Sequence, residues 1–157
     1  MKPDIGVAEK DLQKTAKTLV VILSNETVLY IKTRKFHWNI SGDSFMEFHL
    51  LFENQYKEIE EIIDEVAERI SKLGSKTIGT MQEFIDNATL KEKPANYPTQ
   101  KEMLAELLSD HEEIIKHIRK IVDNEDAEGL DAGSADFITG LMQTHETIAW
   151  KLRRYLK

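Results

Sequence analysis

Apolar residues recur at spacings of three and four along most of the chain, and this period is typical of amphipathic helices. The first run of this kind predicts a helix from about Ala8 to His37. Its repeating apolar positions are Leu12, Ala16, Leu19, Ile22 and Leu29. Ser41, Gly42 and Asp43 then interrupt the pattern, so we expect the first helix to end before them and the chain to turn there.

The starts of three later helices are indicated by capping boxes, in which a serine or threonine is followed three residues later by glutamate. The three pairs are Ser44 and Glu47, Thr80 and Glu83, and Thr99 and Glu102. They predict a long helix that ends just before Gly74, a short helix that ends near Asn87, and a long helix that ends near Asp123. The acidic segment DNEDAEGLDAG then leads to a last helix from about Ser134 to Leu156.

Four long helices with a short helix between the second and the third predict an all-α protein, folded as a four-helix bundle with one crossover connection. The chain has 157 residues and a mass of 18.1 kDa, which suits one domain with a substantial core. No repeat or linker interrupts the pattern, so residues 1–157 are expected to form a single domain.

Composition restricts the chemistry and the compartment. The chain has no cysteine, which excludes disulfides and thiol catalysis and favours a reducing compartment. The first twenty residues lack the apolar run of a signal peptide, and no segment reaches membrane-spanning length. We therefore expect a cytoplasmic protein without membrane association. The net charge of −7 repels phosphate backbones and suits the attraction of cations.

The second predicted helix carries two pairs of candidate metal ligands. His49 stands four residues before Glu53, and Asp64 stands four residues before Glu68. On a helical wheel all four residues fall on a flank beside the apolar stripe and away from the face opposite the core. Glu53 and Asp64 are separated by roughly 16 Å along the helix axis, because each residue advances the helix by about 1.5 Å. One chain therefore cannot bring both pairs to the same ion.

A two-fold symmetric partner resolves this separation. The residue numbers of His49 and Glu68 have the same sum as those of Glu53 and Asp64. If a second copy of the helix packs antiparallel around an axis between Glu58 and Ile59, each pair faces the other pair of the second copy. Such a dimer contains two identical sites, and both chains contribute to each.

His37 adds a second imidazole, because the short turn before the second helix can bring it close to His49. Two imidazoles and three carboxylates suit a redox metal such as Fe(II), since calcium and magnesium prefer shells of oxygen alone. A simpler alternative is open for each residue. Carboxylates four residues apart usually form a solvated face, and a lone histidine near an apolar face is more often structural than a ligand.

The segment that carries these residues resembles the Dps family, the dodecameric mini-ferritins of bacteria and archaea. The resemblance rests on His37-Trp38-Asn39, Gly42, Phe45, His49, Asp64-x-x-x-Glu68-Arg69 and Leu73-Gly74. The short helix after the second long one and the ending HETIAWKLRRYL are similar to the family as well. The resemblance implies a ferritin-like four-helix bundle and a homo-oligomer of twelve chains.

The resemblance also implies a function. It implies a ferroxidase site between two-fold-related subunits, where His37, His49 and Glu53 of one chain and Asp64 and Glu68 of the other bind one or two irons. Fe(II) would be oxidised by hydrogen peroxide, or by oxygen, and stored as ferric mineral inside the shell, which protects against oxidative stress. Trp38 would take up stray oxidising equivalents, or serve only as an interface aromatic. Asp136 would line an iron entry pore.

Two alternative functions are open, and three further histidines lie outside the candidate metal site. Some Dps proteins coat DNA through a lysine-rich arm, but here acidic residues dilute the lysines of the N-terminal segment, so DNA binding is possible but not favoured. A purely structural helical assembly without metal is a third alternative. His111, His117 and His145 show no partner spacing, and we expect them to be structural. No histidine has Glu three residues before it, which argues against a di-iron centre within one bundle.

Overall fold

The computed structural model describes residues 2–123 and 129–157, and this part of the chain is helical without any strand. The prediction of an all-α protein is therefore confirmed. None of the described helices is both long enough and apolar enough to cross a bilayer. The helices are α1 Glu9–Asn39, α2 Phe45–Lys72, α3 Met81–Asn87, α4 Gln100–Val122 and α5 Ala132–Tyr155.

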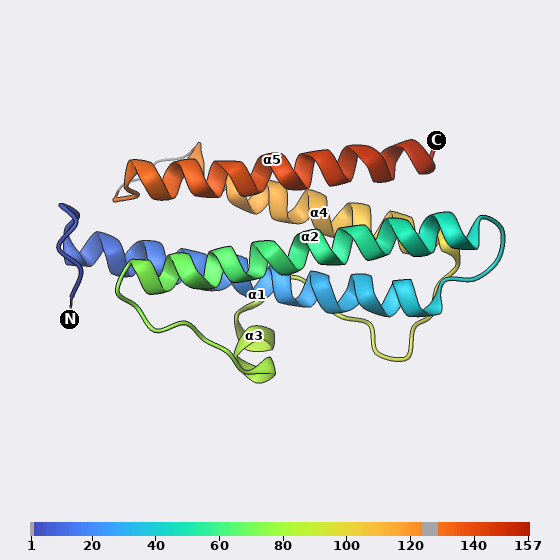
Figure 1. Ribbon diagram of the computed structural model, residues 1–157, viewed down its shortest axis with the longest axis horizontal. Coiled ribbons are helices and arrows are strands. Elements are labelled where there is room, and N and C mark those ends of the chain that lie inside the picture. Colours follow the sequence, from blue (N-terminus) through green and yellow to red (C-terminus); the bar gives the residue numbers. More distant parts are fainter. Residues whose placement is uncertain (1, 124–128) are drawn as a thin grey trace.

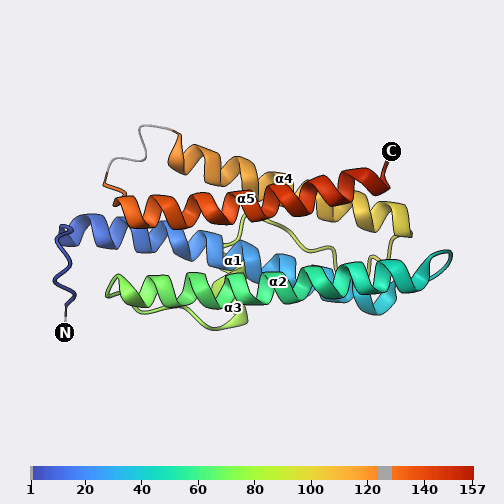
Figure 2. The ribbon, with the colours of Figure 1, turned by 45° about the horizontal axis from the view of Figure 1, so that its top comes forward.

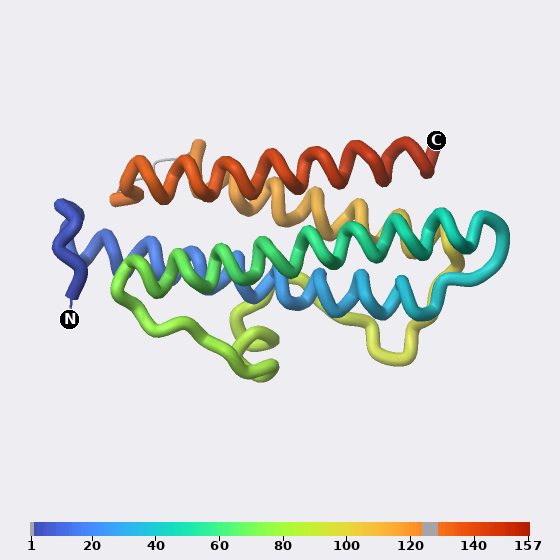
Figure 3. The backbone as a smooth tube through the Cα atoms, in the orientation of Figure 1, coloured from blue at the N-terminus to red at the C-terminus, as the bar shows by residue number. Residues whose placement is uncertain are grey.

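The four long helices form a bundle, with α3 lying beside it (Figure 1). α1 and α2 run antiparallel as one pair, and α4 and α5 run antiparallel as the other. The segment between α2 and α4 returns along the length of the bundle, so α2 and α4 run in the same direction (Figures 1 and 3). The turned view shows the same pairing, with α5 above α1 and α2 (Figure 2). This is the predicted bundle with one crossover and a short helix inserted in it.

The core is built from the apolar stripes that the periodicity predicts. Leu19 and Leu29 of α1 are fully buried, as are Phe52 and Ile59 of α2. The other pair of helices contributes Leu107, Ile118, Ile138 and Ile148, which are also fully buried. Burial of side chains of this size stabilises the bundle by about 1.5–3 kcal/mol each relative to exposure, which makes the stripes the main source of stability.

Two of the three predicted capping boxes are present. At the starts of α3 and α4, the hydroxyl oxygens of Thr80 and Thr99 accept hydrogen bonds from the backbone N–H of Glu83 and Glu102, and each glutamate binds back to the cap residue. Gly74 ends α2 as predicted, with φ of 83°, a backbone conformation that favours glycine.

The capping box predicted at Ser44 is wrong. Ser44 adopts the left-handed conformation, with φ of 57°, and its side chain makes no capping hydrogen bond. A helix cap of this type needs an extended backbone at the first position, so the sequence signature alone does not suffice. The turn before α2 is held from α4 instead, because the Gln100 amide donates hydrogen bonds of 2.7 Å to the carbonyls of Ser41 and Asp43.

Polar residues of α1 anchor the crossover segment to the bundle. The Asn25 carbonyl oxygen accepts hydrogen bonds from the backbone N–H groups of Thr89 and Leu90, at 2.8 and 3.0 Å. The Lys32 ammonium, which is nearly buried, contacts Asp110 at 2.7 Å and donates to the carbonyl of Lys91 at 2.9 Å. The crossover therefore covers the side of α1 that its bundle neighbours leave open.

Candidate metal centre

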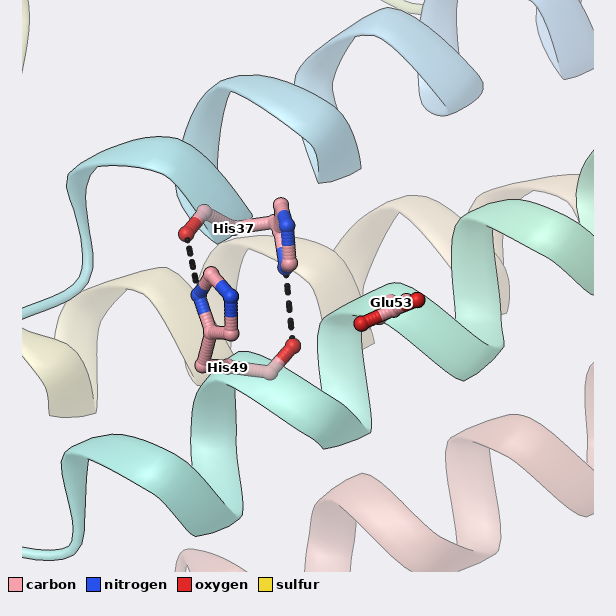
Figure 4. A group of neighbouring side chains, drawn as sticks. All are labelled: His37, His49 and Glu53. Carbon is pink, nitrogen blue, oxygen red and sulfur yellow. Dashed lines mark hydrogen bonds between the residues drawn. The ribbon is translucent and has the colours of Figure 1, made fainter.

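His37 and His49 face each other across the turn between α1 and α2. Their rings are stacked, with centroids 3.8 Å apart. Nδ1 of His37 lies 2.8 Å from the carbonyl oxygen of His49, and Nδ1 of His49 lies 3.1 Å from the carbonyl oxygen of His37 (Figure 4). Because a carbonyl oxygen only accepts, both Nδ1 atoms carry a proton, and in the neutral form of each ring Nε2 has a free lone pair. A histidine that binds a metal through Nε2 has this tautomer.

Glu53 follows His49 by one helical turn and completes a cluster of three possible ligands. One ligand atom from each of His37, His49 and Glu53 lies within 4.8 Å of the other two (Figure 4). Among the described residues, no other set of three His, Cys, Asp or Glu side chains converges in this way. His37 is buried, whereas His49 and Glu53 are partly exposed, so the cluster opens toward the surface of the bundle.

The charge of Glu53 is balanced by a neighbouring lysine. The Lys57 ammonium, one turn further along α2, donates a hydrogen bond to the Glu53 carboxylate. This bond lowers the pKa of the Glu53 carboxyl below its ordinary value, and the positive charge of Lys57 acts in the same direction. Glu53 is therefore a carboxylate at neutral pH, and Lys57 must release it before a cation can bind.

Asp64 and Glu68 lie outside the cluster. Both are exposed on α2, and Glu68 forms an ion pair of 2.9 Å with Lys72. They are on the same helix as Glu53 but too far along it to reach the same ion, as the rise per residue requires. A single chain thus presents a three-ligand half-site and, three turns away, two further carboxylates. Their joint role in one site stays a prediction.

Aromatic and cationic side chains lie around His37 and its neighbour Trp38, and of these only Trp38 was expected from the sequence. Trp38 is 63% exposed, and its ring lies 5.2 Å from the Arg34 guanidinium. Arg34 also lies over Tyr56, at 4.8 Å, and the Tyr56 ring meets the His37 ring edge-on at 5.2 Å. Tyr56 therefore packs against the His37 ring. No sequence pattern indicated this contact, because it joins two helices.

Asp136 lies on the exposed side of the first turns of α5, and it makes no part of the cluster. The neighbouring Asp131 caps α5 by accepting a hydrogen bond from the Ser134 N–H at 3.0 Å. Arg69 donates hydrogen bonds to the side chains of Asp131 and Ser134. Glu125, Asp126 and Glu128 of the acidic segment before this helix lie outside the described residues.

His111 and His145 show no partner spacing in the sequence, but they are partners in the structure. Their Nδ1 atoms are 2.8 Å apart, and Nε2 of His145 is 2.8 Å from Oε1 of Glu26. The three side chains come from α4, α5 and α1 and are fully buried. The sequence could not reveal this group, because its members lie far apart along the chain and share no helical spacing.

Comparisons with known proteins agree with this architecture. The ferritin-like domain family matches residues 16–157. A DPS protein from Vibrio cholerae, described as a member of a broad superfamily of ferritin-like diiron-carboxylate proteins, superposes with a TM-score of 0.91 at 29% identity, covering 99% of this chain and 97% of that chain. The protein is thus a ferritin-like helical bundle.

Sequence relatives narrow the assignment. An uncharacterized low temperature-induced protein of a Nostoc species is 40% identical over 98% of this chain and 86% of its own length. A DNA protection during starvation protein of Bacillus anthracis is 31% identical, over 89% of this chain and 97% of its own length. A solved Dps structure from Thermosynechococcus elongatus is 32% identical, with a TM-score of 0.87 over 94% of this chain and 93% of that chain. The chain belongs to the Dps family.

Proposed function

We propose that this protein is a ferroxidase and iron store. It binds Fe(II) at sites shared between two chains, oxidises it with hydrogen peroxide, and deposits the ferric product inside a hollow shell of twelve chains. The observation that carries the proposal is the half-site of His37, His49 and Glu53, whose three ligand atoms lie within 4.8 Å of one another. Membership in the Dps family supports iron as the ion and protection against oxidative stress as the role.

The donor set explains why the substrate is a redox metal. Two neutral imidazoles and one carboxylate form a mixed nitrogen and oxygen set, which suits Fe(II) better than calcium or magnesium. Each histidine is oriented by the bond from its Nδ1 to a backbone carbonyl, so Nε2 of each ring is held ready for the ion. We infer that the partner chain supplies Asp64 and Glu68, which makes five ligands and room for two irons.

With two irons in one site, peroxide can be reduced without release of a radical. Two Fe(II) supply one electron each, and one hydrogen peroxide with two protons then yields two molecules of water. The protein contributes the placement and the charge of the ligands, while the metal supplies the redox chemistry. Trp38, which follows His37 in the chain, is our candidate to intercept a stray one-electron oxidant, and Asp136 is our candidate for a pore residue that attracts Fe(II).

An anaerobic titration with Fe(II), followed by addition of peroxide and monitored by absorbance, tests the proposal. We expect saturable binding at about one or two irons per chain, with sites of this type shared between chains. His37→Ala should abolish that binding. Gln13→Ala, far from the cluster, is the matched control. Wild-type protein without saturable binding would refute the ferroxidase function and leave a structural assembly.

The assembly is tested separately by sedimentation of the protein in dilute physiological buffer. Each half-site needs a partner chain, which argues against a monomer, and membership in the Dps family supports a shell of twelve chains, so we expect a large closed particle. A mass near that of one or two chains would contradict this part of the proposal.

The coating of DNA is the alternative function, and the structure offers it little support. A mobile arm would be needed, yet Pro3 packs so closely on Gly74 that a Cβ atom at Gly74 would lie 2.5 Å from its ring. Lys2 is paired with Glu9 at 2.6 Å, and Arg153 is paired with Glu112 at 2.8 Å. A gel shift at rising salt distinguishes the two functions, because phosphate-driven binding weakens steeply with salt.

A further inference from the structure

The bundle core contains a chain of three ionisable side chains that the proposed iron chemistry does not use. Glu26 of α1, His145 of α5 and His111 of α4 are each 0% exposed. Oε1 of Glu26 is 2.8 Å from Nε2 of His145, and Nδ1 of His145 is 2.8 Å from Nδ1 of His111. We call these three residues the core chain. Ionisable groups are rarely buried completely, so their placement calls for an explanation.

The geometry argues against a metal ion at the core chain. His145 presents opposite ring nitrogens to its two neighbours, so the possible ligand atoms are strung out in a row. They do not meet the 4.8 Å convergence that the described residues reach at His37, His49 and Glu53. Donors and acceptors in a row are instead suited to a chain of hydrogen bonds, with one hydrogen atom between each pair of neighbours.

Counting hydrogen atoms shows how many protons the core chain can hold. A contact of 2.8 Å between two imidazole nitrogens needs one hydrogen between them, carried by one ring and accepted by the lone pair of the other. If both rings were imidazolium, both Nδ1 atoms would carry hydrogen and the contact would become repulsive. His111 and His145 therefore cannot both be charged while the bundle is closed.

Neither end of the core chain is hydrogen-bonded to a group that could accept an added proton. Oε2 of Glu26 and Nε2 of His111 are buried and have no hydrogen-bond partner in the described part of the protein. Burial, and to a lesser extent the neighbouring His145, lower the pKa of His111 well below its ordinary value. His111 is thus neutral in the closed bundle, and a charge on it has nothing to stabilise it.

The other helices supply no further charge to this part of the core. The buried side chains of α2 include Gln55 but no ionisable group, and α3 has no buried residue. The other buried charge of α1 is that of Lys32, and this ammonium pairs with Asp110 and Glu106 of α4, at 2.7 and 3.3 Å. The protonation of the core chain is consequently governed by its own three members.

We propose that the core chain is an acid switch of the bundle, in which protonation of His111, between α4 and α5, opens the fold. The sign follows from linkage. In the unfolded chain His111 titrates near its ordinary value of about 6.5, whereas in the folded bundle it takes up a proton only at much lower pH. Its contribution to stability is therefore fully present above about pH 6.5 and is lost as the pH falls below that value.

The test compares wild type with His111→Asn in iron-free, assembled protein, using urea unfolding between pH 5 and 7.5 at fixed protein concentration. Asparagine can donate a hydrogen bond but does not titrate. Relative to this variant, the wild-type folding equilibrium constant should fall by up to about tenfold per pH unit below about 6.5. If wild type and His111→Asn lose stability in parallel over this range, the acid switch is refuted.

His117→Asn is the matched control on the same helix. His117 is only partly buried, and burial lowers its pKa less severely. The ratio of the folding equilibrium constants of wild type and His117→Asn should therefore level off at a higher pH than the ratio for His111→Asn. Equal pH dependence for His111→Asn and His117→Asn would show that any buried histidine on α4 has the same effect, and it would overturn the role of the core chain.

Two measurements keep the proposal testable if His111→Asn does not fold. Hydrogen exchange of wild-type α4 and α5 amides, corrected for intrinsic rates, should lose protection by up to about tenfold per pH unit below about 6.5. Unchanged protection would refute the switch. Addition of Co(II) to wild type and to His111→Gln should give identical visible spectra, and a band that depends on His111 would overturn the proton chain in favour of a metal site. None of these results depends on ferroxidase activity.

Discussion

The shared site can be tested by complementation between two inactive variants. His49→Ala/Glu53→Ala removes part of the half-site that the structure brings together. Asp64→Ala/Glu68→Ala removes the two carboxylates that lie three turns away on α2. Each variant assembled alone should be nearly inactive, since every site in its dimers lacks one of the two halves. When the two variants are co-assembled, a mixed dimer has one site with both defects and one site with none.

The expected recovery follows from the two-fold geometry. With random pairing of equal amounts, about half of the dimers are mixed and one of their two sites is intact, so about a quarter of the wild-type activity should return. As the proportion of one variant changes, activity should rise and fall symmetrically around the equal mixture. Initial rates of Fe(II) oxidation with peroxide measure it, and mass spectrometry verifies that the particles are mixed.

A matched control separates complementation from a general effect of mixing. His37→Ala damages the same half-site as His49→Ala/Glu53→Ala, so a mixture of these two should recover no activity. Flat activity across all mixtures of the first pair, in particles shown to be mixed, would refute the shared site. It would also show that Glu53 and Asp64 do not serve the same ion in spite of their matched register.

Three further predictions use the described contacts. Lys57→Gln should raise the affinity for Fe(II) about two- to fivefold in anaerobic calorimetry, because Glu53 no longer has to give up a weak, solvent-exposed ion pair; a weaker affinity would contradict this. Thr99→Ala should lower the free energy of unfolding by about 1 kcal/mol in urea titrations, because the hydrogen bond from the Glu102 N–H is lost, and no change would be inconsistent with the cap. Asp136→Asn should slow uptake at low Fe(II) and leave oxidation at saturating Fe(II) unchanged, and equal uptake at matched ionic strength would remove Asp136 from the pore.

The type and order of the helices could be predicted from the sequence, whereas the backbone conformation at the start of α2 could not. The apolar periodicity located all four long helices, because burial of a stripe determines which face turns inward. The capping signature succeeded at Thr80 and Thr99 but failed at Ser44. The difference lies in the preceding turn, where Gly42 has φ of 101° and the chain enters α2 through a left-handed residue. Such a backbone path depends on contacts from α4, which local sequence does not report.

The half-site was predictable in its residues but not in its proton positions. The spacing of His49 and Glu53 on one helix flank, with His37 across a short turn, was sufficient to expect a cluster. The reciprocal bonds from each Nδ1 to the opposite carbonyl depend on how α1 ends and how α2 begins. These bonds select the tautomer that leaves Nε2 of both rings free, so the same turn that joins the helices also prepares the ligands.

The core chain and the half-site use the same residue types for different chemistry, and the direction of the rings decides which. At the half-site, His37 and His49 each direct Nδ1 toward a carbonyl, and one ligand atom from each of His37, His49 and Glu53 lies within 4.8 Å of the other two. In the core, His145 uses its two nitrogens on neighbours in opposite directions, so the three side chains do not converge on one point. A metal ion needs ligand atoms that converge on one point, whereas a shared hydrogen atom needs only a donor and an acceptor in a row. The bundle interior can therefore contain two histidines and a glutamate without competing for the Fe(II) that we propose binds at the half-site.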